Sequence, residues 1–456
     1  MTLTSTLRRA RAGAACALAL LGLGAAHAAL PIEHWQQPGG AQVYLVRSPS
    51  IPMVDVQIDF DAGGRRDPRE QAGLADAAAG MAAKGVRAAG GQAALDENAL
   101  GQAWADLGAS FGADATSDRT SYSLRSLTDP ALLEPALQLA ARQLAEPAFP
   151  AAVWQRERER WIAALREADT RPGTQAGRAF RQALYPTHPY GYEATAQTLA
   201  RITADDLRAF HARAIQPCRA KVSIVGAVDR AQADHIARTL LGRVPASPGA
   251  PACASLPEIA AVPPLAAPVE RRIPFQAAQA QVLIGQPGIR RADPDYFART
   301  VGNYILGGGG FVSRLMNEVR EKRGLTYGVS SSFSPALQAG PFAITLQTRP
   351  DQAGQAVQVV REVLAGFVAD GPTDEELQAA KANLIGGFAL RLDSNAKLLA
   401  NVANIAWNGL PLDYLDTWTQ QVDKLSTADI RAAFQRHLQP DRMVTVVLGA
   451  REGGQP

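Results

Sequence analysis

The feature that most constrains this sequence is a helix-to-strand unit that occurs twice. The first copy, ITADDLRAFHARAIQPCRAKVSIVGAV, begins at Ile202, and the second, LSTADIRAAFQRHLQPDRMVTVVLGA, begins at Leu425. In each copy a hydroxyl residue (Thr203, and Thr427 or Ser426) caps a helix, a proline ends it, and a β-branched strand follows. Identical residues recur in the same order, which favours an internal duplication over chance similarity. The chain therefore contains two similar halves.

A segment rich in proline and alanine separates the halves. Its sequence, VPASPGAPACASLPEIAAVPPLAAPVE, covers 244–270 and predicts an extended linker over the surface. The chain has 456 residues, a length that suits two domains. We place the first domain at 29–243 and the second at 271–456.

Strands and helices mix in both halves without strict alternation. In the first half we predict strands at 54–60, 110–115 and 120–127 and helices at 73–84, 130–144, 151–167 and 177–184. In the second half we predict strands at 280–286, 326–333 and 342–348 and helices at 296–305, 312–322, 351–369, 373–390 and 394–407. Because a doubly wound parallel sheet needs regular alternation, the pattern favours an α+β fold.

The first 28 residues have the composition of a secretory signal peptide. Arg8, Arg9 and Arg11 precede an apolar run at 13–26, and Ala-His-Ala at 26–28 is a small-x-small cleavage site. We predict cleavage after Ala28 and export, most simply to a periplasm. The alternative is an N-terminal anchor that is never cut, although the run is short for a membrane span. No other segment reaches the length of a membrane span, so we expect a soluble mature chain.

The net charge narrows the class of partner, and the cysteine content limits the possible disulfides. Without the three arginines of the signal, the chain has 43 basic and 43 acidic residues. A neutral chain lacks the clustered positive field that nucleic acids or anionic membranes require. Cys218 and Cys253 remain after export, and they form either one disulfide or two free thiols.

Common catalytic motifs for metal or phosphate chemistry are absent from the sequence. A hydrolytic zinc needs three protein ligands, yet no two histidines of the mature chain lie three to five residues apart, and neither HExxH nor HxxEH occurs. We expect surface or capping roles for these histidines, which are His34, His188, His211, His235 and His437. The glycine-rich LGGGGFVSRL at 306–315 lacks the GK[ST] of a P-loop, so we interpret it as a turn.

One pair of side chains suggests chemistry. In EVREKRGLTYG, Arg320 falls at the end of a predicted helix and Tyr327 at the start of a strand, with Gly324 as the helix stop. A guanidinium and a phenol at one point could donate hydrogen bonds to a carbonyl oxygen and stabilise an oxyanion. The alternative is ordinary structure, because an arginine near a helix C-terminus complements the helix dipole.

Several segments resemble the pitrilysin/insulinase family of inverted zinc metallopeptidases, the family of the mitochondrial processing peptidases. They are AGLADAAAGMAAKG, DATSDRTSY, YPTHPYGY, ITADDLRAFH, IVGAVD, ILGGGGFVSRLMNEVREKRGLTYG and TDEELQAAKANLIGGF. The resemblance covers essentially the whole mature chain. Its most specific part is the glycine-rich stretch that runs into Arg320 and Tyr327.

The resemblance implies that the family's zinc motif is lost here. Family members have GLAHFLEHMxFKG, in which the two histidines bind zinc and the glutamate is the general base. On this frame Asp76 stands at the first histidine, Ala79 at the glutamate and Gly80 at the second histidine. The third ligand falls near RERERWIAALRE, where Ala164 gives the best register, and Glu157, Glu159 and Glu167 leave it open. We therefore expect no metal or other cofactor in this chain.

The resemblance also implies an architecture and a role. We expect two homologous domains, each a mostly antiparallel sheet with helices on one face, that form half of a clam-like chamber. The implied role is the non-zinc subunit of a heterodimeric peptidase, in which Arg320 and Tyr327 reach a peptide at the zinc of an HxxEH-bearing partner. An edge strand at Ala113, Asp114 and Ala115 would take up the peptide as an added strand. The alternatives are an inert scaffold of the same fold and a self-sufficient hydrolase with an unrecognised site.

Overall fold

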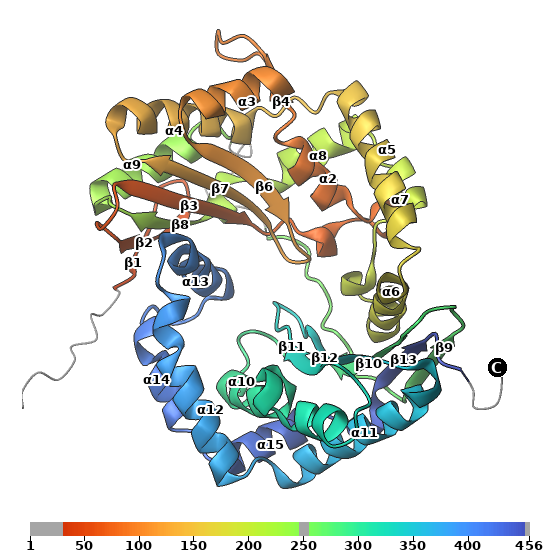
Figure 1. Ribbon diagram of the computed structural model, residues 1–456. Helices are drawn as coiled ribbons and strands as arrows, with labels where there is room; N and C mark the ends of the chain where they lie inside the picture. The colour runs from red at the N-terminus through yellow and green to blue at the C-terminus, as the bar shows by residue number, and fades with distance from the viewer. Residues whose placement is uncertain (1–30, 246–254, 452–456) are drawn as a thin grey trace, which may run out of the picture.

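The computed structural model describes residues 31–245 and 255–451, which form two domains (Figure 1). The predicted signal peptide at 1–28 lies outside these residues, so its cleavage stays a prediction. In the described ranges, no helix is both long enough and apolar enough to cross a membrane.

The first domain is built on a six-stranded sheet in the order β1-β2-β8-β3-β7-β6. The strands are β1 (Glu33–Gln36), β2 (Gln42–Arg47), β3 (Met53–Phe60), β6 (Ser110–Ala115), β7 (Thr120–Leu127) and β8 (Lys221–Gly226). All neighbours are antiparallel except β2 and β8. Alternate residues of β3, including Val54, Val56 and Ile58, are fully buried. They join a core with α2 (Leu74–Met81), α4 (Pro130–Ala145), α8 (Ala204–Ala214) and α9 (Arg230–Leu241).

The second domain has a five-stranded sheet in the order β11-β12-β10-β13-β9. Its strands are β9 (Val269–Ile273), β10 (Ala280–Pro287), β11 (Val329–Phe333), β12 (Pro341–Thr348) and β13 (Val444–Leu448), antiparallel except for β13 and β9. The core on one face comes from α10 (Tyr296–Asn303), α11 (Ala353–Asp370) and α15 (Thr427–His437). Both domains thus have the predicted α+β architecture.

The duplicated unit occupies the same place in both sheets. Strands β8 and β13 each pair in parallel with one neighbour and antiparallel with the other. Thr203 caps α8 by accepting the backbone N–H of Asp206, as predicted. In the second copy the cap is Ser426, and Thr427 is the first helical residue.

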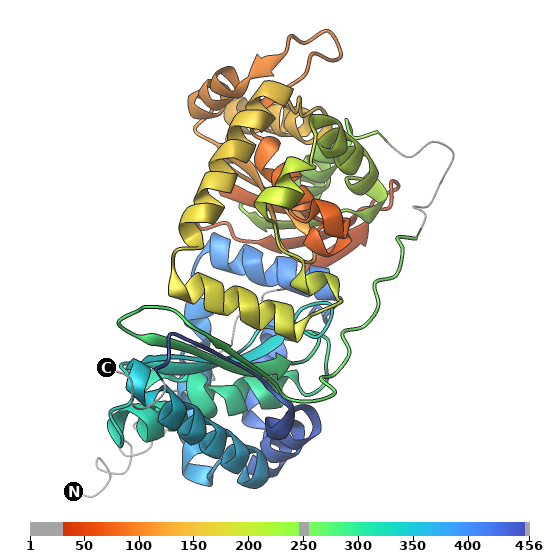
Figure 2. The ribbon, with the colours of Figure 1, turned by 90° about the vertical axis from the view of Figure 1, so that its right-hand side faces the viewer.

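The two domains exchange one helix each. Helix α6 (Pro172–Leu184), from the first half of the chain, packs on β10, β13 and β9 of the second sheet. Helix α13 (Asn395–Asn408), from the second half, packs on β8, β3 and β2 of the first sheet. Figures 1 and 2 show both helices between the sheets. The sheets therefore also carry a helix on their second face, which the sequence did not predict.

The linker begins after α9 and ends where β9 starts at Val269, two residues inside its predicted boundary. Residues 255–268 contain no helix or strand and run along one side from the first domain to the second (Figure 2). Cys218 is disulfide-bonded. Cys253, which the sequence leaves open as a disulfide partner of Cys218 or a free thiol, lies outside the described residues.

Some helix boundaries differ from the prediction where glycines occur. The predicted helix at 312–322 is a 3-10 turn (Gly310–Val312) followed by a π-helical turn (Met316–Glu321), and a second π turn covers Tyr304–Gly308. Gly310, in a left-handed conformation with φ of 64°, breaks any regular helix there. The other α-helices and strands of the described residues are α3 (Glu97–Asp106), α5 (Ala151–Ala168), α7 (Ala196–Ala200), α12 (Asp374–Gly386), α14 (Tyr414–Asp423), β4 (Gly85–Val86) and β5 (Leu95–Asp96).

His211 is buried, a position that the sequence did not predict, although its contact with the last turn of α4 is one of the expected capping roles. Its Nε2 lies 2.9 Å from the carbonyl oxygen of Leu144 on α4, and the ring packs edge-on against Phe149. The sequence missed this because helix periodicity alone does not show which neighbouring element covers a helix face. His188 is also buried, but it caps a turn as expected by accepting the N–H of Tyr190.

We predict that His211 makes the stability of the protein depend on pH. Burial lowers its pKa to about 4, whereas an unfolded histidine titrates near 6.5. Between these values the unfolded chain binds the proton and the folded chain does not, so acidification favours unfolding. The free energy of unfolding should fall by about 3 kcal/mol from this group as the pH drops from 6.5 to 4.

Chemical denaturation across this pH range measures the effect. His211→Gln keeps a donor for Leu144 and should remove the destabilising contribution of this group, so that its stability falls less on acidification than that of the wild type. His235→Gln, on the exposed face of α9, should leave the wild-type pH dependence unchanged. Equal pH slopes in the wild type and His211→Gln would contradict the prediction.

Candidate functional site

Helix α2 carries the positions at which the family resemblance predicts a lost zinc motif. Its N-terminus is held by Asp67, whose carboxylate accepts the backbone N–H groups of Gly73 at 2.9 Å and Ala75 at 3.0 Å. Asp76 and Gly80 lie four residues apart on the exposed side of the helix, while Ala79 is buried in the packing. The small residues thus keep a packed helix.

Asp76 lines a pocket of about 560 Å³. Its walls come from α2, the β6–β7 turn, α5 and α6, and they include Trp161 and Leu165. Desolvation by these walls, together with the nearby carboxylate of Asp114, raises the pKa of Asp76 to about 6. The structure thus brings together two predicted site residues from different elements, α2 and β6.

The residues of this pocket do not fit a catalytic zinc ion. Such a site needs three protein ligands, and Asp76 is the one candidate from the motif positions that has a ligand atom. Two other carboxylates line the pocket. Asp67 already uses both oxygens for backbone N–H groups, and burial raises its pKa to about 7. Glu193 is paired with Arg178 at 3.1 Å and Arg181 at 3.0 Å. A protonated carboxyl is a poor metal ligand.

Helix α5 supplies no third ligand to the pocket. Trp161 and Leu165 line it, and Ala164 lies exposed between them in the sequence. The three glutamates that left the register open do not line it and are engaged elsewhere: Glu157 with Arg156 and Arg160, Glu159 with Gln155, and Glu167 with Arg171.

We predict that Asp114 and Asp76 are electrostatically coupled. Asp114→Asn removes a neighbouring negative charge, so the pKa of Asp76 should fall towards its ordinary value. Carboxyl carbon NMR titration of the variant and the wild type measures the shift. Asp205→Asn, an exposed change on α8, is the control. An unchanged Asp76 titration in Asp114→Asn would contradict the coupling.

Strand β6, with Ala113, Asp114 and Ala115, is the edge of the first sheet. It pairs with β7 alone among the described strands, and Asp114 is exposed opposite Ser121. The backbone groups on its other side are therefore open to an added strand. Helix α2 packs beside β6, which puts this edge next to the Asp76 pocket.

Arg320 and Tyr327 lie in the second domain, on either side of a left-handed Gly324 with φ of 61°. Gly324 donates its N–H to the carbonyl of Arg320 at 2.8 Å, so it ends the helical segment as predicted. The guanidinium of Arg320 lies 3.2 Å from Glu321 and 4.8 Å from the centre of the Phe311 ring. Tyr327 is 87% exposed, and no hydrogen bond joins it to Arg320 in the described structure.

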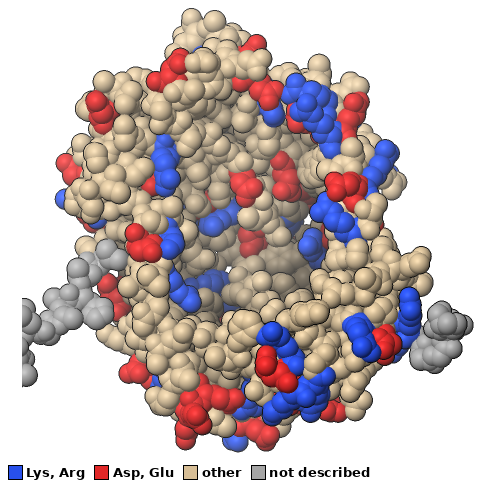
Figure 3. All heavy atoms as spheres, viewed as in Figure 1, with Lys and Arg blue, Asp and Glu red and all other residues tan. Residues whose placement is uncertain are grey.

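Tyr327 borders a second pocket, of about 410 Å³. The other polar side chains around it carry no charge: Gln279, Gln281, Thr326, Ser330, Thr345 and Gln347. Gly173, at the start of α6, lines both this pocket and the Asp76 pocket. The two pockets therefore adjoin at the start of α6, and the space-filling view shows the hollow between the domains (Figure 3).

Two features of the site escaped the sequence analysis. Phe311 and Val312, after the glycine-rich turn, are 71% and 77% exposed, although their apolar character predicts burial.

The second feature is Ser110, which has the G-x-S-x-G spacing of a hydrolase nucleophile in GASFG at 108–112. That motif requires a strand-to-helix turn, whereas Ser110 starts β6 after α3, and none of the described histidines bonds to it.

Comparison with known proteins identifies the family. A model described as insulinase (peptidase family M16) matches residues 42–196, and one described as peptidase M16 inactive domain matches residues 201–384. The solved structure of a peptidase M16 inactive domain from Pseudomonas fluorescens is 36% identical to the chain. It covers 93% of this chain and 100% of its own, with a TM-score of 0.86. This chain belongs to the M16 peptidase family.

Relatives within the M16 family include proteins described as proteases and as non-peptidases. An uncharacterized zinc protease of Mycobacterium leprae is 27% identical over 399 residues, which is 87% of this chain and 86% of that protein. The non-peptidase homolog YmxG of Helicobacter pylori is 24% identical over 411 residues, 88% of this chain and 90% of that protein. The predicted family and fold are therefore confirmed.

Proposed function

We propose that this M16 chain is the catalytically incomplete, non-zinc subunit of an exported heterodimeric zinc peptidase. Zinc and the HxxEH motif belong to a homologous partner, and this chain contributes Arg320 and Tyr327 to the peptide bound there. The observation that carries the proposal is the contrast between the zinc-motif positions of the first domain and Tyr327 of the second. The motif positions Asp76, Ala79 and Gly80 cannot assemble a zinc site, whereas Tyr327 is exposed beside a pocket in an otherwise well-packed domain.

The chemistry of the pair follows from hydrogen bonding. Attack on a scissile carbonyl at the partner's zinc places negative charge on the carbonyl oxygen, and a phenol and a guanidinium are both donors to such an oxygen. Arg320 must exchange its contact with Glu321 for the substrate, and both ends of that contact are partly exposed, so the exchange is inexpensive. The peptide lies along the free edge of β6, where backbone hydrogen bonds hold it whatever its side chains.

The second candidate function is an inert peptide-binding or scaffolding protein of the same fold. The contacts of the Arg320 guanidinium favour it, because they lie 3.2 Å away at Glu321 and 4.8 Å away at the Phe311 ring, whereas catalysis is served best by donors already aimed at the oxyanion. Neither side chain is needed in the core, however, and Tyr327 is almost fully exposed.

Metal analysis and size exclusion of the purified chain, alone and with an HxxEH-bearing homologue, test the proposal. We expect far less than one zinc per chain for the lone protein, and a complex of one copy of each chain that contains zinc. Stoichiometric zinc in the lone chain, or the absence of a complex, would refute the heterodimer.

A further inference from the structure

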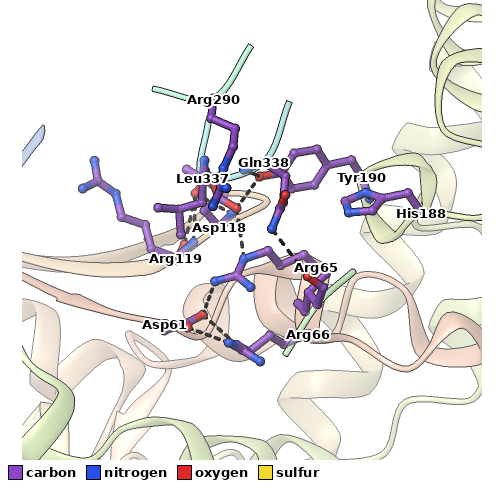
Figure 4. Close-up of polar contacts among 12 residues, drawn as sticks. Asp61, Arg65, Arg66, Asp118, Arg119, His188, Tyr190, Arg290, Leu337 and Gln338 are labelled. Atoms are coloured by element: carbon purple, nitrogen blue, oxygen red, sulfur yellow. Dashed lines mark hydrogen bonds and ion pairs between the residues drawn. The ribbon is translucent and has the colours of Figure 1, made fainter. Parts of the chain in front are cut away.

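The turn between β6 and β7 joins the first domain to the second through a buried carboxylate. Asp118 accepts the backbone N–H of Leu337 at 2.9 Å and the hydroxyl of Tyr190 at 2.6 Å, and it lies 3.0 Å from the guanidinium of Arg65. The Tyr190 hydroxyl in turn accepts the backbone N–H of Gln338 at 3.0 Å. Figure 4 shows this cluster, in which Asp118, Tyr190 and Arg65 are all buried.

The next residue of the turn binds a different part of the second half. Arg119 pairs with the fully buried Asp59 of β3 at 3.1 Å, and its guanidinium lies 5.5 Å from the ring of Trp407 on α13. Lys221 of β8 donates to the carbonyl of Trp407 at 3.0 Å. Cations of the first domain therefore bind the C-terminal end of α13, where the helix dipole is negative.

The linker is hydrogen-bonded to both domains beside the Asp118 cluster. Its backbone carbonyls accept hydrogen bonds from side chains of both domains: Pro257 from Arg66, Ala260 from His188, and Ile259 from Gln338. Since these donors are the cluster residues or their direct neighbours, the turn, the linker and the 337–338 loop form one contact, which we call the seam.

The seam begins one residue after β6, the strand predicted to bind the peptide. β6 ends at Ala115, and Thr116 and Ser117 of the turn line the Asp76 pocket. Because β6 and β7 belong to one continuous six-stranded sheet and Asp118 and Arg119 lie in the turn between them, the placement of β6 relative to the second domain follows that of this turn. We propose that Asp118 and Arg119 are positioning residues that set the angle between the two domains, and with it the placement of β6 relative to Tyr327. The consequence for cleavage rests on the proposed function, whereas the domain angle does not.

The alternative is that the seam only stabilises the fold. Both roles predict a lower melting temperature when a seam hydrogen bond is removed, because a buried polar group loses its partner. Only the positioning role predicts a folded molecule with a different distance between the domains. A distance measurement therefore separates the two roles.

The experiment measures distances by pulsed electron paramagnetic resonance between spin labels at Ala105 on α3 and Gln355 on α11, which are exposed in different domains. Both carboxylate oxygens of Asp118 accept hydrogen bonds, and Asp118→Asn replaces one of them with an NH₂ group that cannot accept. Tyr190→Phe removes only the bridging hydroxyl. Asp205→Asn, whose carboxylate is 90% exposed, is the control. Circular dichroism confirms that each variant is folded.

We expect a single distance population in the wild type and the control. In Asp118→Asn and Tyr190→Phe the ratio of separated to closed domains should rise about tenfold, the order expected for one lost hydrogen bond to a charged group. Wild-type distances in both folded variants would overturn the proposal. If the inter-domain distances change in the variants but no partner-dependent cleavage is found, the proposed function is wrong and the positioning role of the seam is supported. If cleavage depends on Arg320 while the distances do not change, only the positioning role is wrong.

Discussion

Replacing Arg320 with alanine is expected to lower the turnover of the two-chain peptidase by about tenfold or more, the order of one lost oxyanion donor. Tyr327→Phe should have an effect of the same order, because it removes the other donor and leaves the ring in place. Both donors act on charge that develops in the transition state, so kcat should fall more than KM rises. Steady-state cleavage of a peptide by the mixture measures both constants.

Arg323 provides a matched control for Arg320. It lies three residues further on, is also partly exposed, and pairs with Glu318 at 2.7 Å. Arg323→Ala removes the same charge from the same segment and should leave kcat near the wild-type value. If Arg320→Ala and Arg323→Ala lower kcat equally, the effect is one of net charge, and the role assigned to Arg320 is wrong.

Truncating Phe180 to alanine is expected to lower the free energy of unfolding by about 3–5 kcal/mol, as for other buried phenylalanines. Phe180 lies on α6 and is only 6% exposed, in a cluster with Leu184, Val446 and Leu448 across the domain boundary. Its ring packs closely over Gly285 of β10, where a Cβ atom would lie 2.9 Å from the ring. The cavity would therefore weaken the contact of α6 with the second sheet.

Urea denaturation of Phe180→Ala and Gln182→Ala tests this second expectation. Gln182 is exposed on the same helix, so its truncation should change the free energy of unfolding by less than about 0.5 kcal/mol. A loss below about 1 kcal/mol for Phe180→Ala would mean that α6 does not depend on the second sheet.

The elements that the sequence predicted well are those governed by local chemistry. A hydroxyl cap, acids in the first turn and a following proline act within a few residues, and they predicted α8 and α15 together with the strands that follow them. The sequence leaves the second cap open between Thr427 and Ser426, because the two hydroxyl residues are chemically equivalent in that role, and the structure shows Ser426. The glycine-rich segment 306–315 is predicted as a turn, but Gly307 and Gly308 lie in the π turn at Tyr304–Gly308 and Gly310 starts the 3-10 turn at Gly310–Val312, so only part of it is irregular.

The exchanged helices could not be predicted in this way. The apolar faces of α6 and α13 require burial, but helix periodicity does not say which sheet covers them. The same limit applies to the seam, where Asp118 meets a backbone N–H more than 200 residues away. For the candidate site, spacing placed Arg320 and Tyr327 around Gly324, while the side-chain directions depend on Glu321, Phe311 and the neighbouring sheet.

The most direct test of the central claim is a peptide-cleavage assay on three samples at equal concentration: this chain alone, an HxxEH-bearing homologue alone, and their mixture with zinc. We predict that only the mixture cleaves, and that a chelator abolishes the activity. Cleavage by this chain alone, insensitive to chelators, would contradict the account and establish a self-sufficient hydrolase. Full activity of the homologue alone, unchanged by adding this chain, would also contradict the account and would leave this chain the role of a scaffold.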